Sequence, residues 1–600
     1  MTTIMEHMVN PEEEDIPDFE LSPNARFNSR EEAWHALKHL LKDDMKPLRI
    51  TMSLCPECTA DKKWDTMKVP AVVYAQDGMV NMVKECSEHG IIQDKYWEDF
   101  DMYITAERYK DPGIKLLNPQ VDFKASKIDC PKHCGLCVKH KSHTGLGNVV
   151  VTNRCDLACW YCFFYAKEGE PIYEPTLEQI KKMLLKMKNE KPIGANAVQI
   201  TGGEPTLRDD IVEIVKMARE IGYEHVQLNT DGVNFSRKPE LVKAIRAAGS
   251  NVVYMSFDGV TPEVNRKNYY EAPLAIENCR KADLGVVLVP TVIGGVNDHQ
   301  LGAILRFGAA NSDTVRAVNF QPVSLVGRMP KKQREMQRIT IPGCIKRIEE
   351  QTNGEISKED FFTVPSTTKL TNFIEAFTGE DKYRLSIHFA CGAGTYVFHS
   401  NEKKLVPVTR FIDVDGLFDY LQERADDINN SKNKKIARLK AGLQVVAKIN
   451  SFIDYQKVPP ELHIKRMLMK ALMSGNYDGL KDFHKRSMFI GFMHFMDPYN
   501  YDVDRVEKCD IHYAMPDGRV VPFCAFNVIP EMYRDKVQRK YSIPAKEYEE
   551  KTGKKLRFDK FRREYTEEYK RQITEKYYIG ALGKENIPTA LPVIRPKTSA

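Results

Sequence analysis

Short apolar runs alternate with amphipathic helical runs through the middle of the chain, between residues 145 and 330. The apolar runs have the length of buried strands and are rich in Val and Ile; they cover residues 148–152, 197–201, 225–229, 252–257, 286–293 and 317–322. The segments between them, such as LEQIKKMLLKMKNE from Leu177, place apolar residues at helical spacing. Because parallel strands need crossover helices, this alternation predicts an α/β fold built on a partial (β/α)6 barrel.

The rest of the chain divides into smaller segments around this barrel. Alternating runs in the segment before it predict a β-hairpin that turns at Asp77-Gly78. A chain of 600 residues is expected to fold into several domains. We predict a polar and helical N-terminal segment (1–48), a small metal-binding module (49–105), a Cys- and His-rich segment (106–144), the barrel (145–330), a mixed α/β C-terminal extension (331–530) and a Tyr- and Lys-rich tail (531–600).

Composition and charge exclude several classes of protein. Hydrophobic residues make up 42% and charged residues 28%, which is typical of soluble globular chains. The net charge is only +5, and no basic tract is interleaved with aromatic residues, so no nucleic-acid partner is expected. The acidic N-terminus lacks signal-peptide features, and no apolar stretch reaches the roughly 18–20 residues that span a bilayer. We therefore expect a cytoplasmic protein, in which 14 cysteines suit metal ligation better than disulfides.

Three cysteines follow the first predicted barrel strand directly. In TNRCDLACWYC, the residues Cys155, Cys159 and Cys162 form C-x3-C-x2-C. A [4Fe–4S] cluster normally takes four cysteine ligands, so three leave one iron open to an exogenous ligand. The amino and carboxylate groups of S-adenosylmethionine (SAM) suit that position, and one-electron reduction of bound SAM yields a 5′-deoxyadenosyl radical. A zinc site is the alternative, but zinc motifs usually present paired C-x2-C units.

This stretch resembles the signature of the radical SAM superfamily, C-x3-C-x-aromatic-C, with Tyr161 in the aromatic position. The segments TGGEP, QLNTDG, YMSFDG and VIGGVND follow later predicted strands and resemble the SAM-binding elements of that family, in the same order. The resemblance implies a SAM pocket at the C-terminal ends of the strands, and a reductant such as ferredoxin. The residues that it assigns to cofactor binding are Tyr161, Gly202, Gly203, Glu204, Asn229, Thr230, Ser256, Asp258 and Ile293.

Six further cysteines are candidates for one or two auxiliary [4Fe–4S] clusters. One C-x3-C-x2-C set lies in DCPKHCGLCVKHKSHT, without a strand before it, and consists of Cys130, Cys134 and Cys137. A zinc site is the alternative reading of this set. The other set is dispersed over HFACGAGT and KCDIHYAMPDGRVVPFC, and consists of Cys391, Cys509 and Cys524. Ordinary buried cysteine is the alternative for these three.

The N-terminal module carries a separate set of metal ligands. LCPEC and ECSEHG place C-x2-C before the predicted hairpin and C-x2-H after it, which gives Cys55, Cys58, Cys86 and His89. Paired knuckles joined by a hairpin suit tetrahedral zinc or a rubredoxin-like mononuclear iron. Buried thiols without a metal are the alternative.

Several of these motifs together resemble the archaeal tetraether lipid synthase family, which includes macrocyclic archaeol synthases. They are CPEC and KECSEHG, CGLC just before TNRC, and FACG with PFC downstream. The resemblance implies carbon–carbon coupling of the terminal methyl groups of isoprenoid diether lipids, and a peripheral contact with the membrane surface. Met-rich stretches at 467–473 and 488–496 suit a channel for such chains, although Met at helical spacing is more often core.

Three other functions compete with lipid coupling. Older annotation of similar proteins names methylation of a pterin precursor, and multi-cluster maturases that modify peptides also extend the barrel C-terminally. A pure electron carrier is disfavoured, because it needs no SAM pocket. The sequence thus predicts a radical SAM enzyme, with lipid coupling first and pterin methylation or peptide modification as alternatives.

Overall fold

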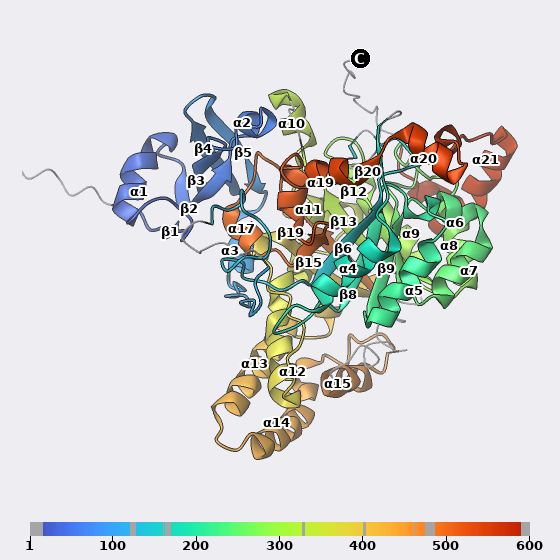
Figure 1. Ribbon diagram of the computed structural model, residues 1–600. Helices are drawn as coiled ribbons and strands as arrows, with labels where there is room; N and C mark the ends of the chain where they lie inside the picture. Colours follow the sequence, from blue (N-terminus) through green and yellow to red (C-terminus); the bar gives the residue numbers. More distant parts are fainter. Residues whose placement is uncertain are drawn as a thin grey trace, which may run out of the picture.

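The computed structural model describes residues 16–120, 128–159, 161–162, 170–326, 330–399, 404–460, 462–474 and 487–589. Figure 1 shows an N-terminal antiparallel sheet beside a large mixed α/β body, with a group of helices projecting from the body's lower side. The large body contains the central sheet and most of the buried apolar core.

The N-terminal sheet has the strand order β1-β2-β3-β4-β5. Its strands are β1 (Glu20–Leu21), β2 (Lys46–Leu54), β3 (Lys68–Gln76), β4 (Met79–Cys86) and β5 (Gly90–Trp97). The predicted hairpin is confirmed, since β3 and β4 pair through Gln76 and Met79 across Asp77-Gly78. Both turn residues have positive φ, 50° and 72°, which is the conformation that a tight two-residue hairpin turn needs.

The predicted fold class is confirmed by six adjacent parallel strands that form an open, barrel-like sheet. They are β6 (Leu146–Thr152), β8 (Ala197–Gly202), β9 (His225–Thr230), β10 (Val252–Ser256), β11 (Gly285–Val289) and β13 (Val315–Pro322). Crossover helices include α4 (Leu177–Lys188), α5 (Ile211–Ile221), α7 (Pro239–Ala247), α8 (Ala272–Lys281) and α9 (Leu301–Ala310). The strand predicted over 286–293 is interrupted at Pro290, which cannot donate a ladder hydrogen bond, and a short β12 (Thr291–Val292) follows.

Strands from the C-terminal half extend both edges of this sheet. β17 (Ser487–Met493) pairs with β13 in parallel, and β15 (Gly392–His399) pairs with β17 in antiparallel orientation. At the other edge, β18 (Ile511–Ala514) pairs with β6 in parallel, and β19 (Val520–Pro522) follows it. The extension therefore contributes walls to any cavity inside the barrel.

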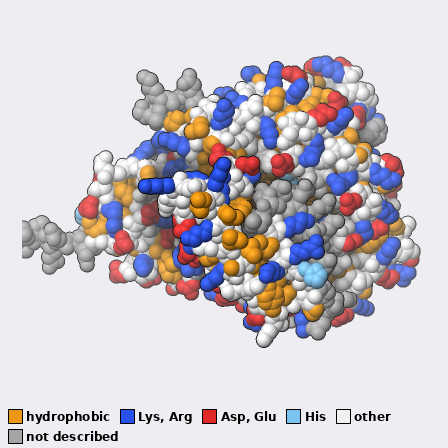
Figure 2. All heavy atoms as spheres, turned by 90° about the horizontal axis from the view of Figure 1, so that it is seen from below, with side chains coloured by type: hydrophobic (Ala, Val, Ile, Leu, Met, Phe, Trp, Pro, Cys, Tyr) orange, Lys and Arg blue, Asp and Glu red, His pale blue; other side chains and the backbone are white. Residues whose placement is uncertain are grey.

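The projecting helices form a separate apolar cluster. They include α12 (Thr368–Thr378), α13 (Val414–Asn430), α14 (Lys434–Lys448) and α15 (Ile464–Ser474). Figure 2 looks onto this side, where orange hydrophobic side chains gather among blue Lys and Arg; the exposed apolar residues of α14 are Ile436, Leu439, Leu443 and Val446. Within the described ranges, every helix is too short or too polar to span a bilayer.

The C-terminal tail packs onto the barrel. It contains α19 (Arg534–Tyr541), β20 (Ser542–Ile543), α20 (Ala545–Thr552) and α21 (Glu567–Ile573), and β20 pairs with β7 (Ile172–Tyr173). Further along, the Tyr578 ring stacks on Tyr269 with ring centroids 4.2 Å apart. In Figure 1 α20 and α21 lie beside α6 (Val233–Arg237) and α8.

A buried ion pair joins the N-terminal sheet to the C-terminal extension. Arg49 of β2 forms an ion pair with Asp502 and a second one with Asp504, at 2.8 Å. Thr51 Oγ1 and Tyr96 OH also donate to Asp502, at 3.0 and 2.9 Å. Burial has the largest single effect on Asp502 and raises its pKa, but Arg49 and the other polar groups around the carboxylate together outweigh burial and hold this pKa well below its ordinary value.

We predict that Arg49→Met lowers the free energy of unfolding by about 3–5 kcal/mol, because it leaves a buried carboxylate without its partner. The folded-state pKa of Asp502 is depressed, so the stabilisation is complete above its unfolded pKa of about 3.9 and is lost as pH falls below that value. Calorimetric unfolding of both proteins at neutral and acidic pH measures this. The exposed Arg280–Asp313 pair supplies the control, since Arg280→Met should cost less than about 1 kcal/mol; equal losses for the two variants would contradict the prediction.

Candidate active site

A cavity of about 490 Å³ lies inside the barrel and is lined by both the barrel strands and the C-terminal extension. Its lining includes residues at the ends of β8, β9 and β10, and residues of β17, β18 and α18 (Phe523–Val528). A cavity of this volume is in the range of small-molecule sites.

The three-cysteine loop forms one end of this cavity. Cys155, Cys159 and Cys162 all line it and are partly exposed there. Burial raises the pKa of Cys159 to about 11 and that of Cys155 well above the ordinary range. Burial therefore disfavours both thiolates, although Lys267 partly offsets this at Cys159, and a bound cluster would stabilise them further. Three sulfur donors on one loop, open to a cavity, fit an iron–sulfur cluster with a free position toward the cavity.

The loop is held against the strand ends by backbone hydrogen bonds. Gly203 N donates to Thr152 O at 2.8 Å, and Glu204 N donates to Arg154 O at 2.7 Å. A Cβ added at Gly203 would lie 2.1 Å from Arg154 O, and one at Gly202 would lie 2.2 Å from Thr152 O. These glycines are thus required for the contact between the strand end and the three-cysteine loop, in addition to any approach of a ligand.

The predicted SAM-pocket residues divide into two groups in the structure. Those that line the cavity are Tyr161, Gly202, Gly203, Asn229, Thr230 and Ser256. Glu204, Asp258 and Ile293 are outside this lining. Ile293 packs with Val323 and Leu325 in a small apolar cluster beside Tyr161.

The Glu204 carboxylate braces the turn that follows β9. It accepts from Thr206 N at 2.9 Å and from Asp231 N at 2.8 Å, and also from Thr230 Oγ1. Burial raises the pKa of Glu204 to about 7, and the nearby Asp156 carboxylate adds to the shift. Glu204 therefore positions Thr230 and Asp231 at the cavity wall from behind.

Several residues of the cavity wall were not predicted from the sequence, among them the charged Lys267 and Asp231. Lys267 Nζ lies 3.0 Å from Asp258 Oδ2 and 4.9 Å from the centre of the Tyr161 ring. Burial has the largest single effect and opposes its charge, but Asp258, Tyr161 and other nearby groups together outweigh burial and raise the pKa of Lys267. Asp231 has a carboxylate oxygen within 4.8 Å of Cys155 Sγ. Asp231 stands inside the QLNTDG segment, whereas Lys267 comes from a loop with no motif.

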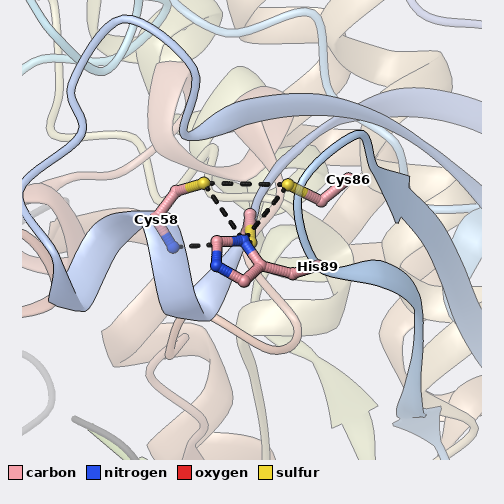
Figure 3. Close-up of side chains that lie close together, drawn as sticks. Cys58, Cys86 and His89 are labelled. Carbon is pink, nitrogen blue, oxygen red and sulfur yellow. Dashed lines mark hydrogen bonds between the residues drawn. The ribbon is translucent and has the colours of Figure 1, made fainter.

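The N-terminal module brings its four predicted ligands together. The ligand atoms of Cys55, Cys58, Cys86 and His89 all lie within 4.8 Å of one another. Cys58 Sγ and Cys86 Sγ are 3.7 Å apart, and His89 Nδ1 is 3.4 Å from each. Figure 3 shows these three side chains pointing toward one another. Tetrahedral zinc, with bonds near 2.3 Å to sulfur, places two sulfur ligands about 3.8 Å apart. The four residues therefore fit one mononuclear metal ion.

We predict that Cys86→Ser removes one tightly bound metal equivalent from the purified protein, because three ligands hold zinc or iron far less tightly than four. Metal analysis of the purified variant measures this. Cys279→Ser is the matched control, since Cys279 is equally buried in α8 but belongs to no ligand group among the described residues. Unchanged metal content in Cys86→Ser would refute the metal site.

The six auxiliary cysteines lie in one region beside the cavity. Cys130 Sγ and Cys134 Sγ are 4.0 Å apart, and Cys134 also interacts electrostatically with Cys509. Cys391 Sγ accepts from Arg505 Nε at 3.3 Å. Burial raises the pKa of Cys524 to about 12, and the Cys391 thiol contributes to that shift. Among the described residues, these six form no group compact enough for a single ion, and their ligand roles stay predictions.

Two family models match the barrel and the N-terminal module separately. The model of the radical SAM superfamily matches residues 149–308, and that of the HMPTM N-terminal zinc ribbon domain matches residues 47–98. GTP 3′,8-cyclase of Limosilactobacillus fermentum is 32% identical over 188 residues, which are 29% of this chain and 54% of that protein. The solved structure of methylornithine synthase is 17% identical, with a TM-score of 0.25, and covers 33% of this chain and 58% of that one. The fold and the three-cysteine loop thus define a radical SAM enzyme, which uses a [4Fe–4S] cluster, SAM and a reductant.

A relative that matches most of the chain shows to which family of radical SAM enzymes it belongs. The 7,8-dihydro-6-hydroxymethylpterin dimethyltransferase of Methanocaldococcus jannaschii is 41% identical over 507 residues, which are 83% of this chain and 96% of the relative. The chain belongs to the family of this protein. The prediction of lipid coupling is therefore wrong. It rested on cysteine motifs that hold clusters and metals, and such motifs recur in enzymes that act on different substrates.

Proposed function

We propose that this chain is a radical SAM methyltransferase that acts on a pterin related to 7,8-dihydro-6-hydroxymethylpterin. The observation that carries the proposal is the 41% identity to the dimethyltransferase over 96% of that protein. The zinc ribbon model, which is that of the HMPTM N-terminal domain, supports the same assignment at the N-terminal module.

Polar side chains on the cavity wall also support a pterin. Asn148, Gln199, Asn319 and Asp510 line the cavity together with Asn229. Asp510 Oδ2 and Asn229 Oδ1 are buried and have no hydrogen-bond partner among the described atoms. A pterin carries N–H groups around its ring edges that can donate to amide and carboxylate oxygens of the wall, whereas a hydrocarbon chain would leave polar groups of the wall unpaired at a cost of about 1–3 kcal/mol each.

Aromatic side chains of the extension offer faces for a flat ring. Tyr513, Phe495 and Phe523 line the cavity, and the last two stack on each other with centroids 3.9 Å apart. Of the methionines in the two Met-rich stretches predicted to form a lipid channel, Met493 lines this cavity among the described residues. The side chains of residues 471–474 lie outside the described part of the chain. An apolar wall with a few convergent polar groups suits a heteroaromatic ligand.

The residues that line the site have different roles. When bound, the cluster and SAM supply a carbon radical that can abstract hydrogen from an unactivated C–H bond. The three-cysteine loop holds the cluster at one end of the cavity, and Thr230 and Ser256 offer hydroxyl groups to SAM beside it. Lys267 and Asp258 hold the ring of Tyr161, which is part of the three-cysteine loop. The amide and carboxylate groups of the wall orient the pterin.

The proposal is tested by asking which candidate substrate stimulates SAM cleavage. Reconstituted enzyme with SAM and dithionite is incubated without oxygen, with 7,8-dihydro-6-hydroxymethylpterin, an archaeal diether lipid or a peptide library. We expect the pterin alone to raise 5′-deoxyadenosine formation above the substrate-free rate. Stimulation by the lipid or the peptides, with none by the pterin, would overturn the proposal.

A further inference from the structure

A second cavity, of about 760 Å³, lies on the outer side of the three-cysteine loop. We call it the basic groove. Its walls come from Arg154 and Asp156 of the loop, from Arg237 at the end of α6 and the following Lys238, and from residues of the tail segment 553–562. It is separate from the central cavity, which Cys155 lines on the opposite side of the same loop.

Positive charge dominates the basic groove. Its lining contains seven Lys or Arg side chains and three carboxylates. Of the carboxylates, Asp209 pairs with Lys554 at 2.8 Å, Asp559 pairs with Arg154 at 2.7 Å, and Asp156 is buried. Among the described residues, no carboxylate lies within ion-pair distance of four lining cations, which are Arg237, Lys238, Lys560 and Arg562. An anionic partner would meet charges that the protein itself leaves uncompensated.

The floor of the basic groove is the backbone of the three-cysteine loop itself. Lys560 Nζ donates to Cys155 O at 2.9 Å, and Phe561 N donates to Asp156 O at 3.0 Å. Arg237 lies over the Phe561 ring, 5.6 Å from its centre, so α6 and the tail segment are joined across the groove. A molecule seated in the groove would therefore lie against the residue that bears a cluster thiol.

We propose that the basic groove is the docking site of a small acidic electron-carrier protein that reduces the SAM-binding cluster. SAM and substrate occupy the central cavity during turnover, so the electron must enter from another side. The groove is open to the surface and carries the charge complementary to an acidic carrier. In each encounter the carrier is oxidised by one electron, which is taken up at the cluster held by Cys155, Cys159 and Cys162, and no bond forms or breaks. The proposal depends on the class of enzyme and not on the pterin substrate.

Binding measurements test this directly. Lys238→Glu/Arg562→Glu reverses two charges of the groove. Lys435→Glu/Lys440→Glu is the matched control, since it reverses two exposed lysines on α14 that form no ion pair among the described residues. The affinity of each holoenzyme for an acidic 2[4Fe–4S] ferredoxin is measured by calorimetry at low and at physiological ionic strength. We expect the groove variant to bind on the order of tenfold more weakly, with a reduced salt dependence, and the control to bind like the wild type.

A second readout separates docking from damage to the cluster loop. SAM cleavage is measured with reduced ferredoxin and with dithionite, which needs no docking site. We expect the groove variant to lose activity with ferredoxin in proportion to the lost affinity and to keep it with dithionite. Unchanged ferredoxin binding, equal weakening in the control, or loss of activity with both reductants would overturn the proposal. Tighter binding of a single-stranded oligonucleotide than of ferredoxin would overturn it as well.

Discussion

Substitution of Cys159 by Ala is expected to reduce 5′-deoxyadenosine formation below detection. Cys159 is the middle ligand of a loop that lines the central cavity, and a [4Fe–4S] cluster is not stably anchored by two thiolates. Burial raises the pKa of this thiol to about 11, so a bound cluster would favour its deprotonated form. The measurement is anaerobic SAM cleavage with dithionite, together with iron content.

The control for this prediction is Cys344→Ala. Cys344 is fully buried in α11 (Ile341–Gln351) and belongs to no ligand group among the described residues, so SAM cleavage should persist. Iron should fall in Cys159→Ala by the content of one cluster only, and the metal of the N-terminal module should remain. Retained SAM cleavage in Cys159→Ala would show that these cysteines do not hold the reactive cluster.

Gly203→Ala should have the next largest effect, a loss of SAM cleavage on the order of 100-fold. The new Cβ would lie 2.1 Å from Arg154 O and 2.6 Å from Arg154 C, which are backbone atoms of the three-cysteine loop. The loop can relieve this clash only by moving away from the strand end, which displaces the neighbouring Cys155. A displacement of about 1 Å in a reacting group is enough for such a loss.

Gly580→Ala is the matched control for this substitution. Gly580 is helical, and its added Cβ would meet nothing closer than Glu575 O at 3.6 Å, so activity should be unchanged. Circular dichroism and thermal unfolding of both variants establish that each is folded. Wild-type SAM cleavage by Gly203→Ala would mean that the contact between strand end and loop does not position the cluster.

The sequence alone was sufficient to predict the parallel strands of the barrel. Their runs of Val and Ile and the helices between them are local signals, and β8, β9 and β13 match the predicted ranges within one or two residues. The four ligands of the N-terminal module were also predictable, because a hairpin with an identifiable turn brings two short motifs together.

Contacts between distant segments were not predictable in the same way. β17 and β18 join opposite edges of the sheet, and Arg49 meets Asp502 across 453 positions of the sequence. No local pattern specifies such pairings, since they depend on how whole units pack. Lys267 could not be predicted for the same reason, because only folding brings its loop beside Tyr161.

The substrate could not be predicted from the sequence motifs. Cysteine spacings report which cluster or metal a loop can hold, whereas a substrate is recognised by side chains gathered from many elements. Asn148, Asn319 and Asp510, which support a pterin here, come from three strands or strand ends that are far apart in the chain. The motifs therefore indicated the radical chemistry correctly and the lipid substrate wrongly.

The mass of the product shows whether this enzyme methylates a pterin. Reconstituted enzyme with SAM, reductant and 7,8-dihydro-6-hydroxymethylpterin is allowed to turn over, and the pterin pool is examined by mass spectrometry against a Cys159→Ala control. We expect a pterin heavier by one or two methyl groups, formed only by the wild-type enzyme. An unchanged pterin, in a reaction where a diether lipid is instead coupled or a peptide modified, would contradict it.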